Sequence, residues 1–135
     1  MGLDTSIFIY FIEENLKYYS VLEKLFKNIE KGKTEIVTST LTLLELLVKP
    51  IKYSKHNLVN EYKNILLKSD RITLFDLDRN ISEISAGIRA KYGTRTPDAI
   101  QIGTAINGNT DYFLTNDKQL KQIKDIPILI LEDFT

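Results

Sequence analysis

Polar and apolar positions along the chain follow two alternating patterns. Short runs of β-branched, aliphatic and aromatic residues between polar segments are typical of strands. The predicted strands cover 35–39, 72–75, 112–115 and 128–131, and a short first strand ends at Leu3. Between them, apolar residues recur every three or four positions, which predicts amphipathic helices. The predicted helices cover 4–12, 19–29, 39–50, 58–66, 78–93, 96–107 and 117–123.

Several helix ends are marked by residues that favour them. Asp78 precedes a predicted helix that ends by Gly93, and Thr96-Pro97 has the composition of a helix start. Pro50 is expected to end the leucine-rich helix, because proline has no N–H to donate and clashes with the preceding turn.

Strands that alternate with helices predict an α/β fold with a mainly parallel central sheet. The chain has 135 residues, which is enough for one domain, and we expect a single domain over 1–135. Sheets of this type bind their ligands at the carboxyl ends of the strands. Residues that follow the strands are therefore the candidates for chemistry.

The amino-acid composition excludes several classes of protein and of catalytic site. The 18 Lys and Arg residues balance 18 Asp and Glu residues, which excludes a histone-like polycation. The chain has no Cys and one His, so disulfides and thiolate sites are excluded and multi-His metal sites are disfavoured. No apolar run approaches the ~20 residues of a membrane-spanning helix, and the first residues lack a signal-peptide pattern. We expect a cytoplasmic protein without a membrane partner.

Four acidic residues are placed where the predicted sheet would bring them together. Asp4 directly follows the first strand, and Asp117 comes two residues after the strand 112–115. Glu45 lies in the helix after the strand 35–39, and Asp98 lies near the start of the helix that Thr96-Pro97 opens. If the alternation is right, all four face one crevice.

Each acid also has a purely structural explanation. Asp4, Asp98 and Asp117 fall at predicted helix starts, where carboxylates cap free N–H groups. Glu45 shares a helical stripe with Leu41 and Val48, so it is expected to be flanked by apolar side chains. The structural alternative for Glu45 is a buried ion pair with Lys49 at i+4.

Convergence of the four acids would require a cation, because carboxylates in one crevice repel one another. An all-oxygen site selects a hard divalent ion, Mg²⁺ or Mn²⁺. Such ions activate water and neutralise phosphate oxygens. From the residues alone, we expect a metal-dependent hydrolase that acts on a phosphate-bearing substrate.

The segments that carry these acids resemble those of the PIN-domain ribonucleases, and the length and order of the chain are similar to VapC-type toxins of toxin–antitoxin pairs. The segments are 3–9 (LDTSIFI), 38–47 (TSTLTLLELL), 96–101 (TPDAIQ) and 113–117 (FLTND). The resemblance spans nearly the whole chain. It implies a three-layer α/β/α domain and an endoribonuclease that uses Mg²⁺ or Mn²⁺.

The resemblance also implies a role for each site residue. Asp4 and Asp98 match direct metal ligands, Asp117 matches a ligand that binds directly or through water, and Glu45 matches a residue that orients a metal-bound water. The residues that match polar supports of these acids are Thr5, Thr115 and Asn116. One departure is the first strand, which is shorter than is usual in the family, so weak edge pairing is expected there.

Basic residues near the acids are candidates for contacts with RNA phosphates. Lys49 and Lys52 follow Glu45 in the sequence, and Arg95 lies three residues before Asp98. The structural alternative for the two lysines is a solvated surface. Further partners, an antitoxin protein and a second copy in a homodimer, are implied by the resemblance alone.

Other functions stay open. A catalytically inactive PIN-like module that binds RNA or protein is one, although it would gain nothing from four mutually repelling acids. An RNA-processing nuclease or a DNA-directed nuclease would share the same acidic pocket. A phosphatase with Asp4 as nucleophile is disfavoured, because such enzymes have an acid two residues later, where this chain has Ser6.

Overall fold

Five short strands form one sheet in the order β3-β2-β1-β4-β5, and every neighbouring pair is parallel. The computed structural model describes residues 1–135. Its strands are β1 (Gly2–Leu3), β2 (Ile36–Ser39), β3 (Ile72–Phe75), β4 (Phe113–Thr115) and β5 (Ile128–Ile130). The predicted mainly parallel sheet is confirmed.

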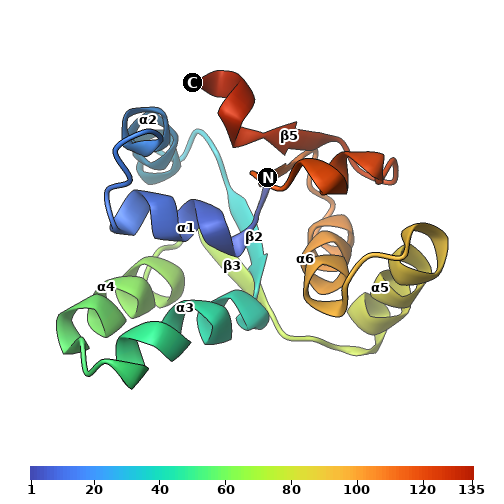
Figure 1. The fold of residues 1–135 in the computed structure, drawn as a ribbon, viewed down its shortest axis with the longest axis horizontal. Coiled ribbons are helices and arrows are strands. Elements are labelled where there is room, and N and C mark those ends of the chain that lie inside the picture. Colours follow the sequence, from blue (N-terminus) through green and yellow to red (C-terminus); the bar gives the residue numbers. More distant parts are fainter.

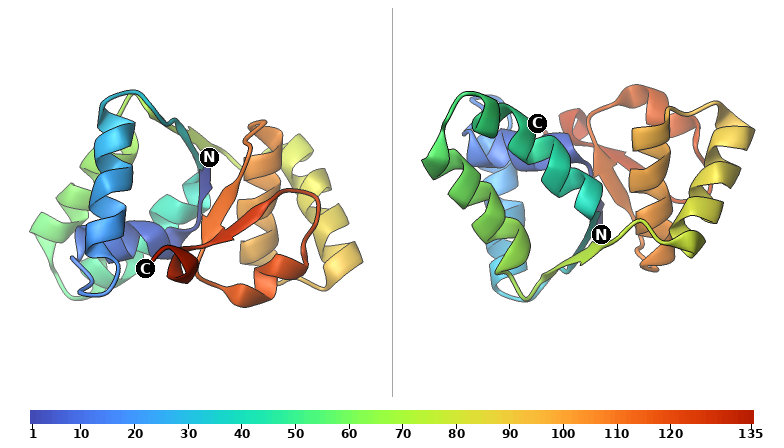
Figure 2. Two further views of the ribbon diagram at one scale, coloured as in Figure 1. Left: turned by 90° about the horizontal axis from the view of Figure 1, so that it is seen from above. Right: turned by 90° about the horizontal axis from the view of Figure 1, so that it is seen from below.

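Helices cover both faces of this sheet and give the predicted three layers (Figure 1). The helices are α1 (Thr5–Ile12), α2 (Tyr19–Glu30), α3 (Thr40–Lys52), α4 (His56–Leu67), α5 (Arg79–Tyr92) and α6 (Thr96–Asn107), with the 3₁₀ helices η1 (Lys118–Gln122) and η2 (Leu131–Phe134). Helices α1 to α4 lie on one side of the sheet, and α5, α6 and η1 lie on the other, as Figure 2 shows from two directions.

Each side of the sheet has its own apolar core. The larger core buries Leu3 and Leu114 from the strands against the helices α1 to α4, with Phe8 and Tyr62 among its largest members. The smaller core packs Phe113 against α5, α6 and η1. Adjacent residues of β4 thus point to opposite cores, which is the alternation expected of a strand that is covered on both faces.

The two-residue strand β1 is the central strand of the sheet, so the expectation of weak edge pairing is wrong. Gly2 pairs with Val37 of β2 on one side and with Phe113 of β4 on the other. A Cβ atom on Gly2 would lie 2.7 Å from the Cβ of Ala105, so only glycine allows α6 to approach β1 this closely.

Most predicted helix ends agree with the structure, and one does not. Asp78 caps α5 by accepting from the N–H of Ile81, and Gly93 ends that helix in the left-handed conformation. The predicted stop at Pro50 is wrong, because α3 continues to Lys52. Pro50 is buried in the last turn, where it cannot donate to the carbonyl four residues earlier, but the turn still closes because the N–H of Tyr53 donates to the carbonyl of Lys49 at 3.1 Å. The final turn, η2, has no counterpart among the predicted elements.

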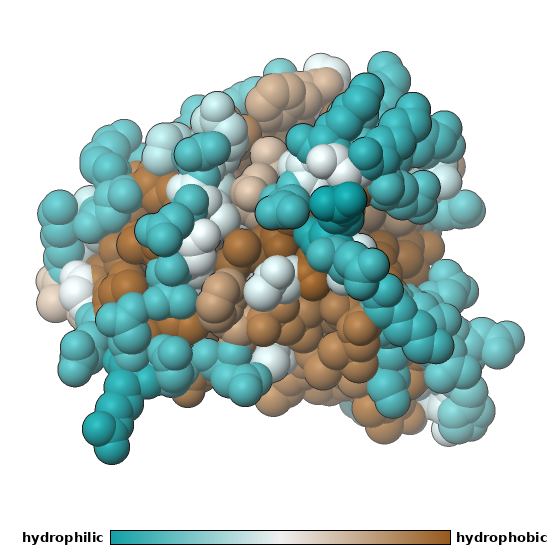
Figure 3. All heavy atoms as spheres, turned by 180° about the vertical axis from the view of Figure 1, so that it is seen from behind, coloured by the Kyte–Doolittle hydropathy of each residue, from teal (hydrophilic) through white to brown (hydrophobic).

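Figure 3 shows the face opposite to that of Figure 1, where apolar side chains gather at the middle. No helix in the structure is both long enough and apolar enough to cross a lipid bilayer.

Candidate functional site

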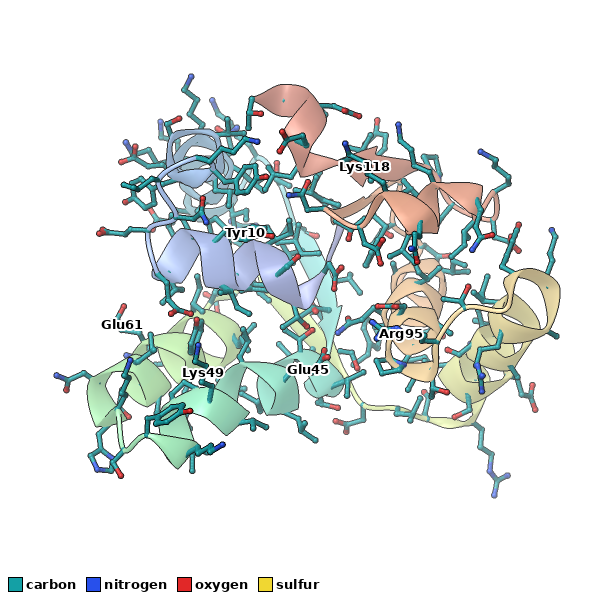
Figure 4. All side chains as sticks on the ribbon, viewed as in Figure 1. Tyr10, Glu45, Lys49, Glu61, Arg95 and Lys118 are labelled. Atoms are coloured by element: carbon teal, nitrogen blue, oxygen red, sulfur yellow. The ribbon has the colours of Figure 1, made fainter.

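The four acids all lie at the edge of the sheet where the strands end. Asp4 is the N-cap of α1 directly after β1, and Asp117 is the N-cap of η1 two residues after β4, the neighbour of β1. Asp98 lies in the first turn of α6, and Glu45 lies in the second turn of α3. Figure 4 looks onto this edge, with Glu45 on α3 and Arg95 at the start of α6 on either side of its middle. We call these residues the acidic quartet.

The buried hydroxyl of Thr115 links two members of the quartet. It donates to Asp4 Oδ2 at 2.6 Å, and it accepts from the backbone N–H of Asp117 at 3.1 Å. Asp4 Oδ1 in turn accepts from the N–H of Thr5 at 2.8 Å. Both oxygens of Asp4 are therefore held by short hydrogen bonds from β4 and α1.

Glu45 is held by a separate network of neutral side chains. Its Oε1 accepts from Thr5 Oγ1 at 2.8 Å and from the amide of Gln101 at 3.3 Å. The same Gln101 amide donates to Thr42 Oγ1 at 2.7 Å and to Thr5 Oγ1 at 3.2 Å. Because Thr5, Thr42 and Gln101 belong to three helices, this network fixes α1, α3 and α6 relative to one another around Glu45.

Asp98 is paired with a cation from its own helix start. Its Oδ2 lies 3.3 Å from Nε of Arg95, and its side chain is 17% exposed whereas that of Arg95 is 81% exposed. Arg95 is predicted from the sequence to contact a phosphate. In the structure its guanidinium already pairs with the carboxylate of Asp98. It remains open to solvent on its other side.

The quartet is electrostatically coupled. Burial raises the pKa of the Asp4 carboxyl, and the charges of Asp98 and Glu45 raise it further, against the hydrogen bonds from Thr115 and Thr5 that lower it. Burial also raises the pKa of Asp98, and Asp117 and Glu45 add to this rise while Arg95 opposes it. Asp4 and Asp98 thus each feel the charge of two other acids, as expected if the four side chains share one region.

The environment expected for Glu45 is wrong. Glu45 is exposed, and Val48, which was expected to flank it with apolar surface, is itself 57% exposed. The alternative of an ion pair with Lys49 is also absent from the structure. The leucine-rich sequence of α3 misleads here because that helix carries apolar residues on an exposed face as well as on its buried one.

Three other residues that are predicted from the sequence to belong to the site lie outside the hydrogen-bond networks of the quartet. Asn116 Oδ1 accepts from the backbone N–H of Glu132 and so ties the segment after β4 to η2. Lys52 is exposed, with its ammonium 5.6 Å from the ring centre of Tyr53. Lys49 is exposed and lies one turn beyond Glu45 on α3.

Two residues of the network around Glu45, Gln101 and Thr42, were not among those predicted from the sequence. Gln101 is only 3% exposed, and its Oε1 has no hydrogen-bond partner. Their spacing indicates that each shares a helix face with an acid. Gln101 comes three residues after Asp98, and Thr42 comes three residues before Glu45. A buried polar residue on such a face is expected to bind a neighbour.

The donor chemistry of the quartet fits a hard divalent cation. All four side chains offer oxygen, and their mutual charges raise the pKa of Asp4 and Asp98, a cost that a cation would relieve. As placed, no three acidic side chains lie close enough to ligate one ion together. Mg²⁺ commonly binds through one or two carboxylates and completes its shell with water and substrate phosphate, so the arrangement suits such an ion.

Comparison with known proteins agrees with this geometry. The family model described as "PIN domain" matches residues 1–126. No curated protein sequence matches the chain significantly.

Three solved structures share the fold. A VapBC2 structure from Rickettsia felis bound to a promoter DNA fragment has a TM-score of 0.70 at 23% identity, covering 95% of this chain and 96% of that chain. A DNA-bound VapBC structure from Salmonella typhimurium has a TM-score of 0.74 at 20% identity, covering 96% of both chains. A toxin–antitoxin complex from Klebsiella pneumoniae has a TM-score of 0.69 at 18% identity, covering 96% of this chain and 95% of that chain.

Proposed function

The chain belongs to the PIN-domain family, and from this premise we propose that it is a metal-dependent endoribonuclease that acts as the toxin of a toxin–antitoxin pair. The observation that carries the proposal is the acidic quartet, in which four acids from separate elements lie at the carboxyl edge of the sheet and the other members raise the pKa of Asp4 and Asp98 beyond the effect of burial. We propose the whole chain, 1–135, as a single nuclease domain.

In this proposal Asp4, Asp98 and Asp117 would hold Mg²⁺ or Mn²⁺, one or two of them directly and the remainder through bound water, and the ion would neutralise phosphate oxygens and lower the pKa of water. Thr115 keeps Asp4 in place and orders the backbone at Asp117. Glu45 is the group that accepts a proton from the attacking water, because only its Oε1 is used by Thr5 and Gln101. Arg95 offsets part of the negative charge next to Asp98.

The toxin role rests on the structures that share this fold, two of which are described as VapBC and one as a toxin–antitoxin complex. Two apolar surfaces support protein partners. One is a cavity of about 190 Å³ with only apolar lining, which includes Val21, Leu25 and Phe134, and we propose it as a contact for the antitoxin. The other lies on α3 and is a candidate for homodimer contact.

The homodimer surface consists of Leu44, Val48 and Ile51, which are 59%, 57% and 60% exposed. Their spacing of four and three residues places them on one stripe of α3. An exposed stripe of three large aliphatic side chains favours burial against another helix. A second copy of the chain would bring an identical stripe.

The proposal is tested with purified protein, a pool of single-stranded RNA and Mg²⁺ or Mn²⁺. Wild type is expected to cleave RNA, and EDTA and the Asp4→Ala or Asp98→Asn substitutions are expected to abolish cleavage. Asp70→Asn is the matched control, since Asp70 is an exposed acid outside the quartet. Cleavage that survives EDTA, or that Asp98→Asn retains in full, contradicts the proposal.

The same assay separates the alternatives. Preference for a DNA pool would favour a DNA-directed nuclease. RNA binding without cleavage would favour an inactive module. Growth arrest on expression, relieved by a co-expressed partner, is expected of a toxin, whereas harmless expression of active enzyme would favour RNA processing.

A further inference from the structure

A partly enclosed cavity of about 190 Å³ lies beside Glu45, between α1, α3 and α4. Its lining is mixed, and the apolar part consists of Ile9 from α1, Leu46 and Pro50 from α3, and Leu58 from α4. Figure 4 shows Lys49 in this region, between the three helices. Apart from Glu45, none of its lining residues belongs to the acidic quartet or its supports.

Two helices lead from the acidic quartet to this cavity. On α1, Ile9 lies four residues after Thr5, and on α3, Lys49 lies four residues after Glu45. Glu45 itself lines the cavity, and four helical residues span about 6 Å, so the cavity extends about one turn beyond Glu45 along α3. A chain-like ligand held at the quartet would therefore reach the cavity with an adjacent unit.

The mouth of the cavity carries two lysines that form no ion pair. Lys49 and Lys55 line the cavity, and neither takes part in any salt bridge of the structure. The turn between α3 and α4 fixes Lys55, because its N–H donates to the carbonyl of Pro50 at 2.8 Å. Two ammonium groups without partners, beside an apolar hollow, are suited to the phosphates of a nucleotide whose base enters the hollow.

The polar groups inside the cavity are arranged to leave a hydrogen-bond acceptor free. The buried Tyr62 donates its hydroxyl to Glu13 Oε2 at 2.6 Å, which orients that carboxylate, and Glu13 Oε1 accepts no hydrogen bond from the protein. An oriented carboxylate can accept from the amino group of a base. The volume is below the ~300–1,000 Å³ of clefts that hold drug-sized ligands, and is therefore suited to one ring system.

We propose that this cavity is a nucleobase-binding subsite, which holds the base next to the phosphate at the acidic quartet while Lys49 and Lys55 contact the flanking phosphates. The inference rests on the proposed function, since it takes single-stranded RNA as the ligand. It assigns the apolar residues Ile9 and Leu58 a direct role in gripping the substrate.

The test measures binding and not cleavage. The probe is a fluorescently labelled single-stranded RNA hexamer of mixed sequence, titrated with the full chain in EDTA and followed by anisotropy. Lys49→Gln/Lys55→Gln is expected to weaken binding about tenfold or more at low salt and to make the salt dependence shallower. Lys31→Gln/Lys68→Gln removes the same charge at exposed positions away from the cavity and is expected to leave binding near that of wild type.

A second measurement addresses the base. In a series of hexamers that each lack one base, one position is expected to lose affinity about fivefold or more with wild type, as stacking losses do. The indole ring of Leu58→Trp would fill the cavity. This variant is expected to bind the complete hexamer more weakly than wild type does, and to bind all hexamers of the series with similar affinity. Thermal unfolding followed by circular dichroism shows whether each variant is folded.

Equal binding by the two lysine pairs, or a flat series with wild type, would overturn the subsite and leave the cavity for a protein partner. This outcome is distinct from failure of the proposed function, because cleavage of the RNA pool with Mg²⁺ is measured separately. Wild type that cleaves RNA but shows no base-dependent position would retain the nuclease and lose the subsite.

Discussion

The hydroxyl of Thr115 donates a 2.6 Å hydrogen bond to the carboxylate of Asp4 and so joins the end of β4 to the end of β1. The same oxygen accepts the N–H of Asp117, so a single side chain serves two members of the quartet. A change at position 115 is therefore expected to affect Asp4 and Asp117 together.

Thr115→Val keeps the shape of the side chain and removes the hydroxyl. We expect RNA cleavage to fall about 10- to 100-fold, as is typical when a group that orients metal ligands is lost. Thr115→Ser, which retains the hydroxyl, is expected to keep most of the activity. Initial cleavage rates at saturating Mg²⁺ provide the comparison, and equal rates for the valine and serine variants would contradict it.

Asp4→Asn tests the electrostatic cost of the quartet. Because the folded-state pKa of Asp4 is raised, the unfolded chain loses this proton at lower pH, and ionisation destabilises the folded state as pH rises. Without metal, the variant is expected to be more stable than wild type at neutral pH. The difference is expected to vanish below the ordinary pKa of about 3.9.

Denaturant unfolding of both proteins at pH 3 and pH 7 in EDTA measures this effect. Added Mg²⁺ is expected to stabilise wild type more than the variant, since a ligand that binds only the folded state raises its stability. A variant that is less stable than wild type at pH 7 would show that hydrogen bonds at Asp4 outweigh repulsion.

Gln101→Leu tests the network around Glu45. Its amide donates to Thr42, Thr5 and Glu45, and leucine leaves these oxygens without that donor. We expect a loss of about 1 kcal/mol in the free energy of unfolding, at the low end of the usual ~1–3 kcal/mol, because the unpartnered Oε1 is removed as well.

The matched change is Gln101→Glu, which places a second carboxylate beside Glu45. Its stability is expected to improve relative to wild type as the pH is lowered and the new carboxyl is protonated, whereas the effect of leucine is expected to be independent of pH. Chemical denaturation at several pH values distinguishes the two.

Gly103→Ala tests the contact between α5 and α6. A Cβ at this position would lie 2.3 Å from Ser85 Oγ, so we expect a loss of about 1–3 kcal/mol in the free energy of unfolding. Ser85→Ala removes a buried hydroxyl that has no partner and is expected to cost little. The double variant is expected to recover most of the loss, and a coupling energy near zero would contradict the contact.

Val48→Glu tests the homodimer surface on α3. A charge in the middle of the stripe of Leu44, Val48 and Ile51 is expected to shift the protein toward monomer without loss of folding. Leu67→Glu is the control, because Leu67 is 53% exposed on α4, outside the stripe. Light scattering across a concentration series reports the mass, and a monomeric wild type would refute the homodimer.

Local sequence signals predicted most of the fold because each depends on nearby residues. Asp78 and Gly93 mark the ends of α5 by satisfying the free groups of that helix. Pro50 failed as a stop signal because proline removes one hydrogen bond without ending a helix whose later residues still close the turn, as the N–H of Tyr53 does by donating to Lys49. The turn η2 is fixed by distant contacts, such as the bond from the Glu132 N–H to Asn116.

In the candidate site too, features that depend on nearby residues could be predicted from the sequence, and features that depend on distant contacts could not. Asp4 and Asp117 could be located because they come one and two residues after a predicted strand, and strand ends can be predicted from hydrophobic runs. The exposure of Glu45 and the role of Gln101 could not be read in this way. Both depend on how α3 and α6 pack, a contact between residues that are 56 positions apart in the chain.

The position of β1 has a consequence for protein synthesis. Asp4 leaves the ribosome well before Thr115 and Asp117, because β4 follows β1 in the chain and Thr115 lies 111 residues after Asp4. Until then β1 has β2 as its only partner, and the acids at its end have no counterpart from β4. A nascent chain therefore carries an incomplete quartet, and the translating cell meets the assembled one only after β4 has left the ribosome.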